Sequence, residues 1–197
     1  MKLSLSLKAI CTVAFLNFIT LSNAHAAADA VVGKTKAQVC FSCHGASGIS
    51  SFSGIPHLAA QPSLSIVYQL IQFKEKRRVG GDMESMAMTL NEQDMRDIAA
   101  YFASLPPPPA KSADEAKVAL GQKISQQNYC QSCHGAQLQG QKHVPRLAGQ
   151  DTKYFITQLK NIRSAVRVDM DGTMGSAARN LTDDDIQALA EFAKSMN

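Results

Sequence analysis

The sequence of 197 residues lacks several features that mark common classes of protein. Aromatic residues make up only 6%, and basic residues form no stripe interleaved with them, which argues against nucleic-acid binding. No segment alternates apolar and polar residues as a half-buried strand would. Beyond residue 21 there is no long apolar run, so the body of the chain offers no candidate membrane span.

The one long apolar run lies at the start of the chain, over residues 10–21. Two lysines precede it, and the small-residue pattern NAHA (23–26) follows it. This order predicts a secretory signal peptide over residues 1–26, cut after Ala26, with the bond after Ala28 as the alternative. An uncleaved membrane anchor is the competing interpretation, but the run is shorter than the roughly 20 residues that span a bilayer.

The rest of the chain is a tandem repeat. The stretch CFSCHG (40–45) returns as CQSCHG (130–135), and the offset between matching features stays between 89 and 91 residues. Three further stretches recur in the same order: GIPHLAAQ (54–61) as HVPRLAGQ (143–150), YQLIQFKEKRR (68–78) as TQLKNIRSAVR (157–167), and LNEQDMRDIAAYFAS (90–104) as LTDDDIQALAEFAKS (181–195). Small insertions between fixed features are what two copies of one fold would show.

The repeat predicts two domains, over residues 27–105 and 114–197, joined by a linker over residues 106–113. The linker contains PPPP (106–109). Consecutive prolines favour a stiff, extended segment and end the preceding helix, so we expect a semi-rigid spacer.

Each half is predicted to be helical, which makes the fold class all-α. The expected helices cover 30–39, 63–76 and 92–104 in the first half, and 114–128, 152–165 and 183–195 in the second. Asn91 and Thr182 are good N-cap residues for the last helix of each half, because Asp94 and Asp185 stand three residues later.

Four cysteines remain beyond the predicted leader, which itself contains Cys11. They form two CxxC pairs, each followed by histidine and glycine: Cys40, Cys43 and His44, then Cys130, Cys133 and His134. Two disulfides are one interpretation in an exported chain. Zinc would need a fourth ligand at close spacing, and His57 and His143 lie 13 and 9 residues beyond the motif histidines. A thioredoxin-like redox pair would need a βαβ setting, which the pattern lacks.

Covalent c-type haem explains the spacing best. Residues three apart on a helical turn point the same way, so both thiols reach one edge of a porphyrin and add to its vinyl groups as thioethers. The next residue then lies beneath the iron. We therefore predict two haem c groups, attached through the four cysteines, with His44 and His134 as proximal ligands.

The repeat also selects the ligand on the other side of each iron. The candidate methionines are Met83, Met86, Met88 and Met95 in the first half, and Met170, Met174 and Met196 in the second. Only Met83 and Met174 correspond, each seven residues before Leu90 or Leu181. Both stand in polar stretches containing glycine, which we expect to be loops. We predict these two as axial ligands, with Met86 as the main alternative in the first half.

His57 and His143 are less favoured as distal ligands. They do not correspond, because His57 follows Pro56 whereas His143 lies two residues before Pro145. We therefore expect both at the surface.

Four further residues are candidates for the surroundings of the haems. A haem-ligating histidine normally donates its other N–H to a carbonyl, and Pro56 and Pro145 supply carbonyls from restricted loops. Arg78 and Arg167 correspond and are candidates for pairing with haem propionates. A solvated arginine at a helix end is the alternative for each.

The motifs together resemble those of the di-haem cytochromes c4. The likeness rests on tandem CxxCH domains with PxLAxQ, QLxxF or QLxxI, a Met loop and an LxxxD helix, and it covers about residues 30–196. It implies two class I cytochrome c domains related by a pseudo-two-fold axis, with haem propionate edges facing each other. It also implies the ligand pairs His44 with Met83 and His134 with Met174.

The resemblance further implies a periplasmic electron carrier rather than an enzyme. Its donor would be a dehydrogenase or a cytochrome bc1-type complex, its acceptor a terminal oxidase or reductase, and its membrane association loose. The alternative is a haem subunit of a periplasmic dehydrogenase that oxidises sulfide, thiosulfate or an alcohol. A catalytic di-haem enzyme such as a peroxidase would need an open iron position, which paired methionines argue against.

The first half departs from the family pattern at two positions. Ser65 stands where the second half has the family's Tyr154, and Ala60 stands where it has Gly149. These differences imply altered packing in the first domain and unequal reduction potentials, but they leave the ligands unchanged.

Overall fold

A computed structural model describes residues 27–197, so the predicted signal peptide and its cleavage site lie outside the described residues. In the first half the helices are α1 (Ala30–Lys36), the 3-10 helix η1 (Ala37–Cys40), α2 (Phe41–His44), α3 (Ser63–Lys74), α4 (Asp82–Met88) and α5 (Glu92–Ser104). In the second half they are α6 (Glu115–Gln127), α7 (Cys130–His134), α8 (Thr152–Arg163), α9 (Thr173–Ala178) and α10 (Asp183–Lys194). Over these residues the only β-type pairing is an isolated bridge between Gln141 and Val144.

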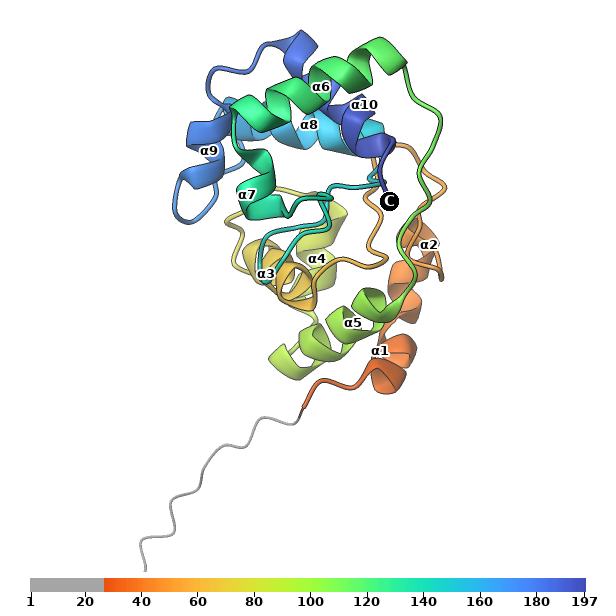
Figure 1. Cartoon of the computed structure of the whole chain (residues 1–197). Coiled ribbons are helices and arrows are strands. Elements are labelled where there is room, and N and C mark those ends of the chain that lie inside the picture. The colour runs from red at the N-terminus through yellow and green to blue at the C-terminus, as the bar shows by residue number, and fades with distance from the viewer. Residues whose placement is uncertain (1–26) are drawn as a thin grey trace, which may run out of the picture.

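The helices form two groups, each around its own core. Figure 1 shows α6, α8, α9 and α10 gathered above and α1, α3, α4 and α5 below. One apolar cluster draws its buried residues from 37–102 and the other from 124–193. None of the helices within residues 27–197 is long and apolar enough to cross a bilayer.

The six predicted helices are present, and the structure adds four short ones, α2, α4, α7 and α9. Asn91 and Thr182 each form a capping box with the aspartate three residues later, as predicted. The expectation that Met83 and Met174 lie in loops was wrong, because both are the second residue of a short helix, α4 or α9. These helices have 7 and 6 residues, too few for their periodicity to stand out in the sequence.

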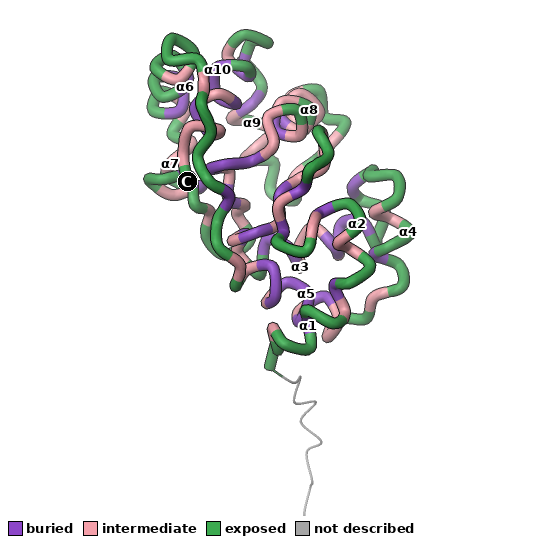
Figure 2. The backbone as a smooth tube through the Cα atoms, turned by 90° about the vertical axis from the view of Figure 1, so that its right-hand side faces the viewer, coloured by how far each residue is buried: buried purple, intermediate pink, exposed green. Residues whose placement is uncertain are grey.

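The two halves meet through a reciprocal pair of contacts. The Gln61 side chain accepts from Arg146 N and donates to Arg146 O, both at 2.9 Å. The Gln150 side chain accepts from His57 N at 2.7 Å and donates to His57 O at 3.0 Å. Gln61 corresponds to Gln150 and His57 to Arg146, so the two contacts are related by a pseudo-two-fold axis. Figure 2 shows buried segments running between the halves.

The proline-rich connection is anchored at one buried residue, while most of its other residues are exposed. Pro108 is fully buried, and a Cβ built on Gly149 would lie 2.9 Å from Pro108 O. Gly149 has a φ of 69°, and the corresponding Ala60 adopts a φ of 55°, in the left-handed region that favours glycine. The first half tolerates alanine there, whereas in the second half the linker carbonyl leaves no room for a side chain.

Candidate functional site

Each CxxCH motif lies on a short helical segment. Cys40 ends η1 and Cys43 lies in α2, while Cys130 and Cys133 both lie in α7. All four thiols are free, so the described residues give no support to the disulfide interpretation. The first cysteine of each pair is partly buried and the second is exposed.

A glycine ends each of these helices directly after the histidine. Gly45 has a φ of 76°, and a Cβ there would lie 2.4 Å from Ile49 O. Gly135 has a φ of 85°. The glycine that follows CxxCH is therefore needed to turn the chain sharply away from the motif.

Both motif histidines are buried and held by a proline carbonyl. His44 Nδ1 lies 2.9 Å from Pro56 O, and His134 Nδ1 lies 2.8 Å from Pro145 O. Since a carbonyl can only accept, Nδ1 carries the proton and Nε2 keeps its lone pair. No hydrogen bond to Nε2 of either ring occurs within residues 27–197.

The protonation state of these rings suits metal ligation. Burial lowers the pKa of the His44 and His134 imidazoles, and the hydrogen bond to proline opposes this more weakly. Both rings are therefore neutral near pH 7, which is the form that donates a nitrogen lone pair to a metal.

The candidate methionines differ in their surroundings. Met83 packs partly buried against the first core, and Met174 does the same against the second. Met86, Met88 and Met170 are 36%, 55% and 70% exposed. In addition, Met95 is buried within the first core, and Met196 packs against the second.

Arg78 and Arg167 meet across the boundary between the halves. Arg78 donates to Gln69 Oε1 at 2.5 Å, to Gln158 Oε1 at 3.0 Å and to Tyr154 Oη at 2.8 Å. Arg167 donates to Gln158 Oε1 at 2.8 Å and to Gln69 Oε1 at 3.1 Å. The two arginines thus share two corresponding glutamines, so neither is a solvated side chain at a helix end.

This arginine pair carries positive charge without an anion. Neither guanidinium has a carboxylate partner within residues 27–197, and the buried Arg78 Nε has no hydrogen-bond partner there. Burial lowers the pKa of Arg167; burial also acts to raise the pKa of Tyr154, but the two arginines outweigh it and lower that pKa. Buried cations require nearby anions. Two haem groups with their propionates toward this boundary would supply carboxylates, so these residues fit that cofactor.

The surface position expected for His57 was wrong. His57 is only 2% exposed, its Nδ1 accepts from Ser50 N at 3.1 Å, and its backbone pairs with Gln150. His143 is exposed as expected, with its ring 6.1 Å from that of Tyr68. Since His57 follows Pro56 as Arg146 follows Pro145, the repeat already held the signal that both occupy one structural position.

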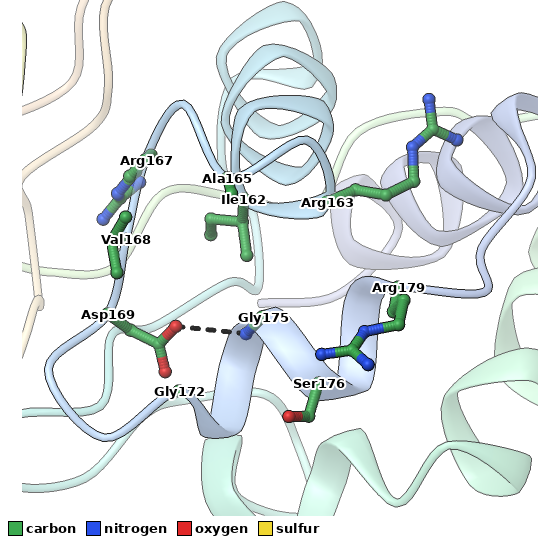
Figure 3. Close-up of a pocket in the computed structure, with 10 residues that line it drawn as sticks. All are labelled: Ile162, Arg163, Ala165, Arg167, Val168, Asp169, Gly172, Gly175, Ser176 and Arg179. Atoms are coloured by element: carbon green, nitrogen blue, oxygen red, sulfur yellow. Dashed lines mark hydrogen bonds between the residues drawn. The ribbon is translucent and has the colours of Figure 1, made fainter.

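A cavity of about 280 Å³ lies between the end of α8 and α9 (Figure 3). Its lining includes Ile162, Asp169 and Gly175 but none of the motif cysteines or histidines. It is therefore separate from the CxxCH sites and lies beside the segment that carries Met174.

Comparison with known proteins gives consistent matches. The family model for cytochrome c matches residues 30–106 and 118–197. A cytochrome c4 from Pseudomonas aeruginosa is 33% identical over 88% of this chain and 92% of its own length. The crystal structure of reduced recombinant cytochrome c4 from Pseudomonas stutzeri has a TM-score of 0.81 and 31% identity, and it covers 87% of this chain and 100% of that one. A thiosulfate dehydrogenase electron acceptor from Stutzerimonas stutzeri is 32% identical over 79% of this chain and 78% of its own.

Proposed function

For this chain, which belongs to the cytochrome c family and within it to the di-haem cytochromes c4, we propose a periplasmic electron carrier whose two irons each have one histidine and one methionine ligand. The chain is a di-haem electron-transfer cytochrome with two covalent haem c groups, and the prediction of two tandem cytochrome c domains is confirmed. The proposal adds the ligands, the compartment and the partners.

The proposed histidine ligands are supported by the same observation in both halves. In both halves a buried, neutral imidazole donates through Nδ1 to a proline carbonyl and keeps Nε2 for a metal. The carbonyl fixes the plane of the ring and the tautomer, so the ligand needs little rearrangement. Four free thiols in the same two CxxCH motifs provide the covalent attachment.

The proposed methionine ligands are supported by their corresponding positions in the two halves and by their partial burial. Met83 and Met174 take the same place in the two short helices, and each packs against its own core. Haem iron supplies one-electron chemistry, and methionine as sixth ligand raises its potential. Two protein ligands on each iron leave no position for a substrate, which suits a carrier and not an oxidoreductase with an open iron.

The arginine pair has a proposed role between the haems. Arg78 and Arg167 would hold the propionates of both groups at the boundary, because their buried charge requires carboxylates. Such an arrangement would bring the two cofactors close to each other and would favour electron exchange between them.

We propose a dehydrogenase or a cytochrome bc1-type complex as donor, and an oxidase or reductase as acceptor. The second candidate function is that of a haem subunit of a periplasmic dehydrogenase. The similarity to a thiosulfate dehydrogenase electron acceptor favours this function. Stable co-purification with a catalytic subunit would establish this second role, whereas isolation as a free protein would support the first.

Spectroscopy of ligand variants tests the proposed ligation. We expect a pyridine haemochrome assay to return two haems per chain and the ferric protein to show the weak near-infrared band of an iron–methionine bond. Met83→Ala and Met174→Ala should each remove about half of that band, whereas Met86→Ala, at an exposed position of α4, should leave it intact. Loss of the band through Met86→Ala would overturn the first-domain assignment, and rapid CO binding by the reduced wild type would argue against two saturated irons.

A further inference from the structure

The segments that lead to Met83 and Met174 differ in length. From Arg78 to Met83 the chain runs five residues, and from the corresponding Arg167 to Met174 it runs seven. The longer segment contains Asp169, which has no counterpart in the first half. Figure 3 shows the Asp169 carboxylate turned toward the start of α9.

Asp169 holds the backbone of the proposed ligand itself. Its Oδ2 accepts from Met174 N at 2.8 Å, and its Oδ1 accepts from Gly175 N at 3.1 Å. Hydrogen bonds to a carboxylate are about twice as strong as those between neutral groups. One side chain thereby fixes two successive peptide units at the methionine.

The first half uses a weaker arrangement. Met83 N donates to the backbone carbonyl of Gly80 at 3.2 Å. The side-chain hydrogen bond of this segment runs from Gly80 N to Glu84 Oε1 at 3.1 Å and does not involve the amide of Met83. Met83 is therefore held through its own chain, without a carboxylate bound to its peptide group.

Packing contributes little to holding the longer segment. Val168 and Met170 are exposed, and a Cβ on Gly172 would meet no atom within 4 Å. On its other side lies the cavity of about 280 Å³, lined in part by Asp169 and Gly175. Apart from the contact of Met174 with the second core, side-chain hydrogen bonds restrain this end of α9, and Asp169 supplies the two that reach Met174 N and Gly175 N.

We propose that Asp169 is a positioning residue that keeps Met174 on the second iron, so that this iron releases its methionine more slowly than the first. The inference rests on the proposed axial roles of Met83 and Met174. It predicts two centres with the same ligand types, of which the second takes up added ligands more slowly than the first.

Imidazole binding to the ferric holoprotein tests this proposal, because added imidazole occupies an iron only after methionine has left. We expect two phases in the wild type. Met174→Ala should abolish the slow phase, and Met83→Ala the faster one. Asp169→Ala should accelerate the slow phase about tenfold or more and leave the faster phase unchanged, since two charge-assisted hydrogen bonds to the ligand segment are lost.

Two further variants separate positioning from a general effect on folding. Asp169→Asn keeps the shape of the side chain but turns an NH2 group toward one of the two N–H donors, so it should also accelerate the slow phase. Asp184→Ala removes a carboxylate at an exposed position of α10, outside the segment 167–175, and should leave both phases unchanged.

The outcomes distinguish a failure of the proposed ligation from a failure of the proposed role of Asp169. If Met174→Ala changes neither the slow phase nor the near-infrared band, the proposed ligation fails. If Met174→Ala behaves as expected but Asp169→Asn leaves the slow rate unchanged, or if the wild type shows equal rates at both irons, the role of Asp169 is refuted while the ligation stands. An equal acceleration by Asp184→Ala would also refute it.

Discussion

Gly33 and Gly121 are the residues at which the first and last helices of each half cross. A Cβ on Gly33 would lie 1.9 Å from Asp97 O, and one on Gly121 would lie 2.1 Å from Ala188 O. Both atoms belong to the backbone of a neighbouring helix, which cannot move aside as a flexible side chain could. The crossing of α1 over α5, and of α6 over α10, therefore depends on the absence of a side chain.

Gly33→Ala and Gly121→Ala should each destabilise their own domain. Alanine gains about 1 kcal/mol of helix propensity, but overpacking typically costs about 1–3 kcal/mol and more when backbone must move. We expect a net loss of about 2 kcal/mol in the free energy of unfolding, measured by guanidinium titration. Lys34→Ala, at an exposed position of α1, should stay within about 0.5 kcal/mol of wild type. A glycine variant as stable as wild type would contradict the crossing geometry.

Sequence reasoning at the residue level succeeded where the repeat supplied a comparison. The CxxCH residues, Pro56 and Pro145 were found from chemistry and spacing, and the structure contains the histidine–proline hydrogen bonds. Asp169 was missed because its partners are backbone amides, which leave no pattern in the sequence. His57 was misplaced because it was compared with His143, whereas its position after Pro56 corresponds to Arg146, which is also buried.

At the scale of elements, α1 is held on α5 by charge as well as by close approach. Lys36 Nζ lies 2.7 Å from Asp97 Oδ2 and 2.8 Å from Asp94 Oδ1. The Asp97 side chain is 4% exposed, and it also accepts from Asp29 N and Gln93 Nε2. The hydrogen bond from Lys36 comes first among the causes that lower the pKa of Asp97. In the second half Ala188 takes the place of Asp97, so this arrangement belongs to the first domain alone.

These contacts predict acid sensitivity in the first domain. A carboxyl whose folded pKa is lowered binds fewer protons folded than unfolded, so its contribution to stability is present above its ordinary pKa of about 4. That contribution is lost as the pH falls through the lowered folded pKa. Asp97→Asn should reduce stability at neutral pH and flatten the decline of first-domain stability below about pH 4.

The measurement is the free energy of unfolding as a function of pH for wild type and Asp97→Asn. Asp184→Asn, at an exposed position of α10, is the control and should follow the wild-type curve. A steep acid decline that persists in Asp97→Asn would show that other carboxylates dominate.

Helix prediction worked for the long elements because amphipathic spacing and capping signals agreed. Asn91 and Thr182 marked the starts of α5 and α10, and both capping boxes are present. The short helices α4 and α9 follow glycines at positive φ, Gly81 and Gly172, and such glycines also mark loops. A helix of fewer than two turns after a glycine therefore could not be distinguished from a loop by its sequence pattern alone.

At the scale of the whole molecule, the repeat predicted two copies of a fold but not how they face each other. The orientation is fixed by side chains whose partners lie about 85–93 residues away, such as Gln61 with Arg146 and Gln150 with His57. Because each glutamine bonds to backbone, its partner's residue type is unconstrained, which explains why histidine and arginine occupy equivalent places. The same boundary brings together Arg78 and Arg167.

Removal of these two glutamines should uncouple the domains. Each buried side chain satisfies one N–H and one C=O of the opposite half, and a buried polar group left without a partner costs about 1–3 kcal/mol. The wild type should therefore unfold with its halves coupled, whereas Gln61→Ala/Gln150→Ala should show two separate calorimetric transitions at lower temperatures. The transition temperatures of the two single variants should lie between those of the wild type and the double variant. They should be similar to each other, because the two contacts are symmetric. Gln122→Ala, at an exposed position of α6, should not change the profile, and a double variant indistinguishable from wild type would mean that the arginine and linker contacts suffice to hold the halves together.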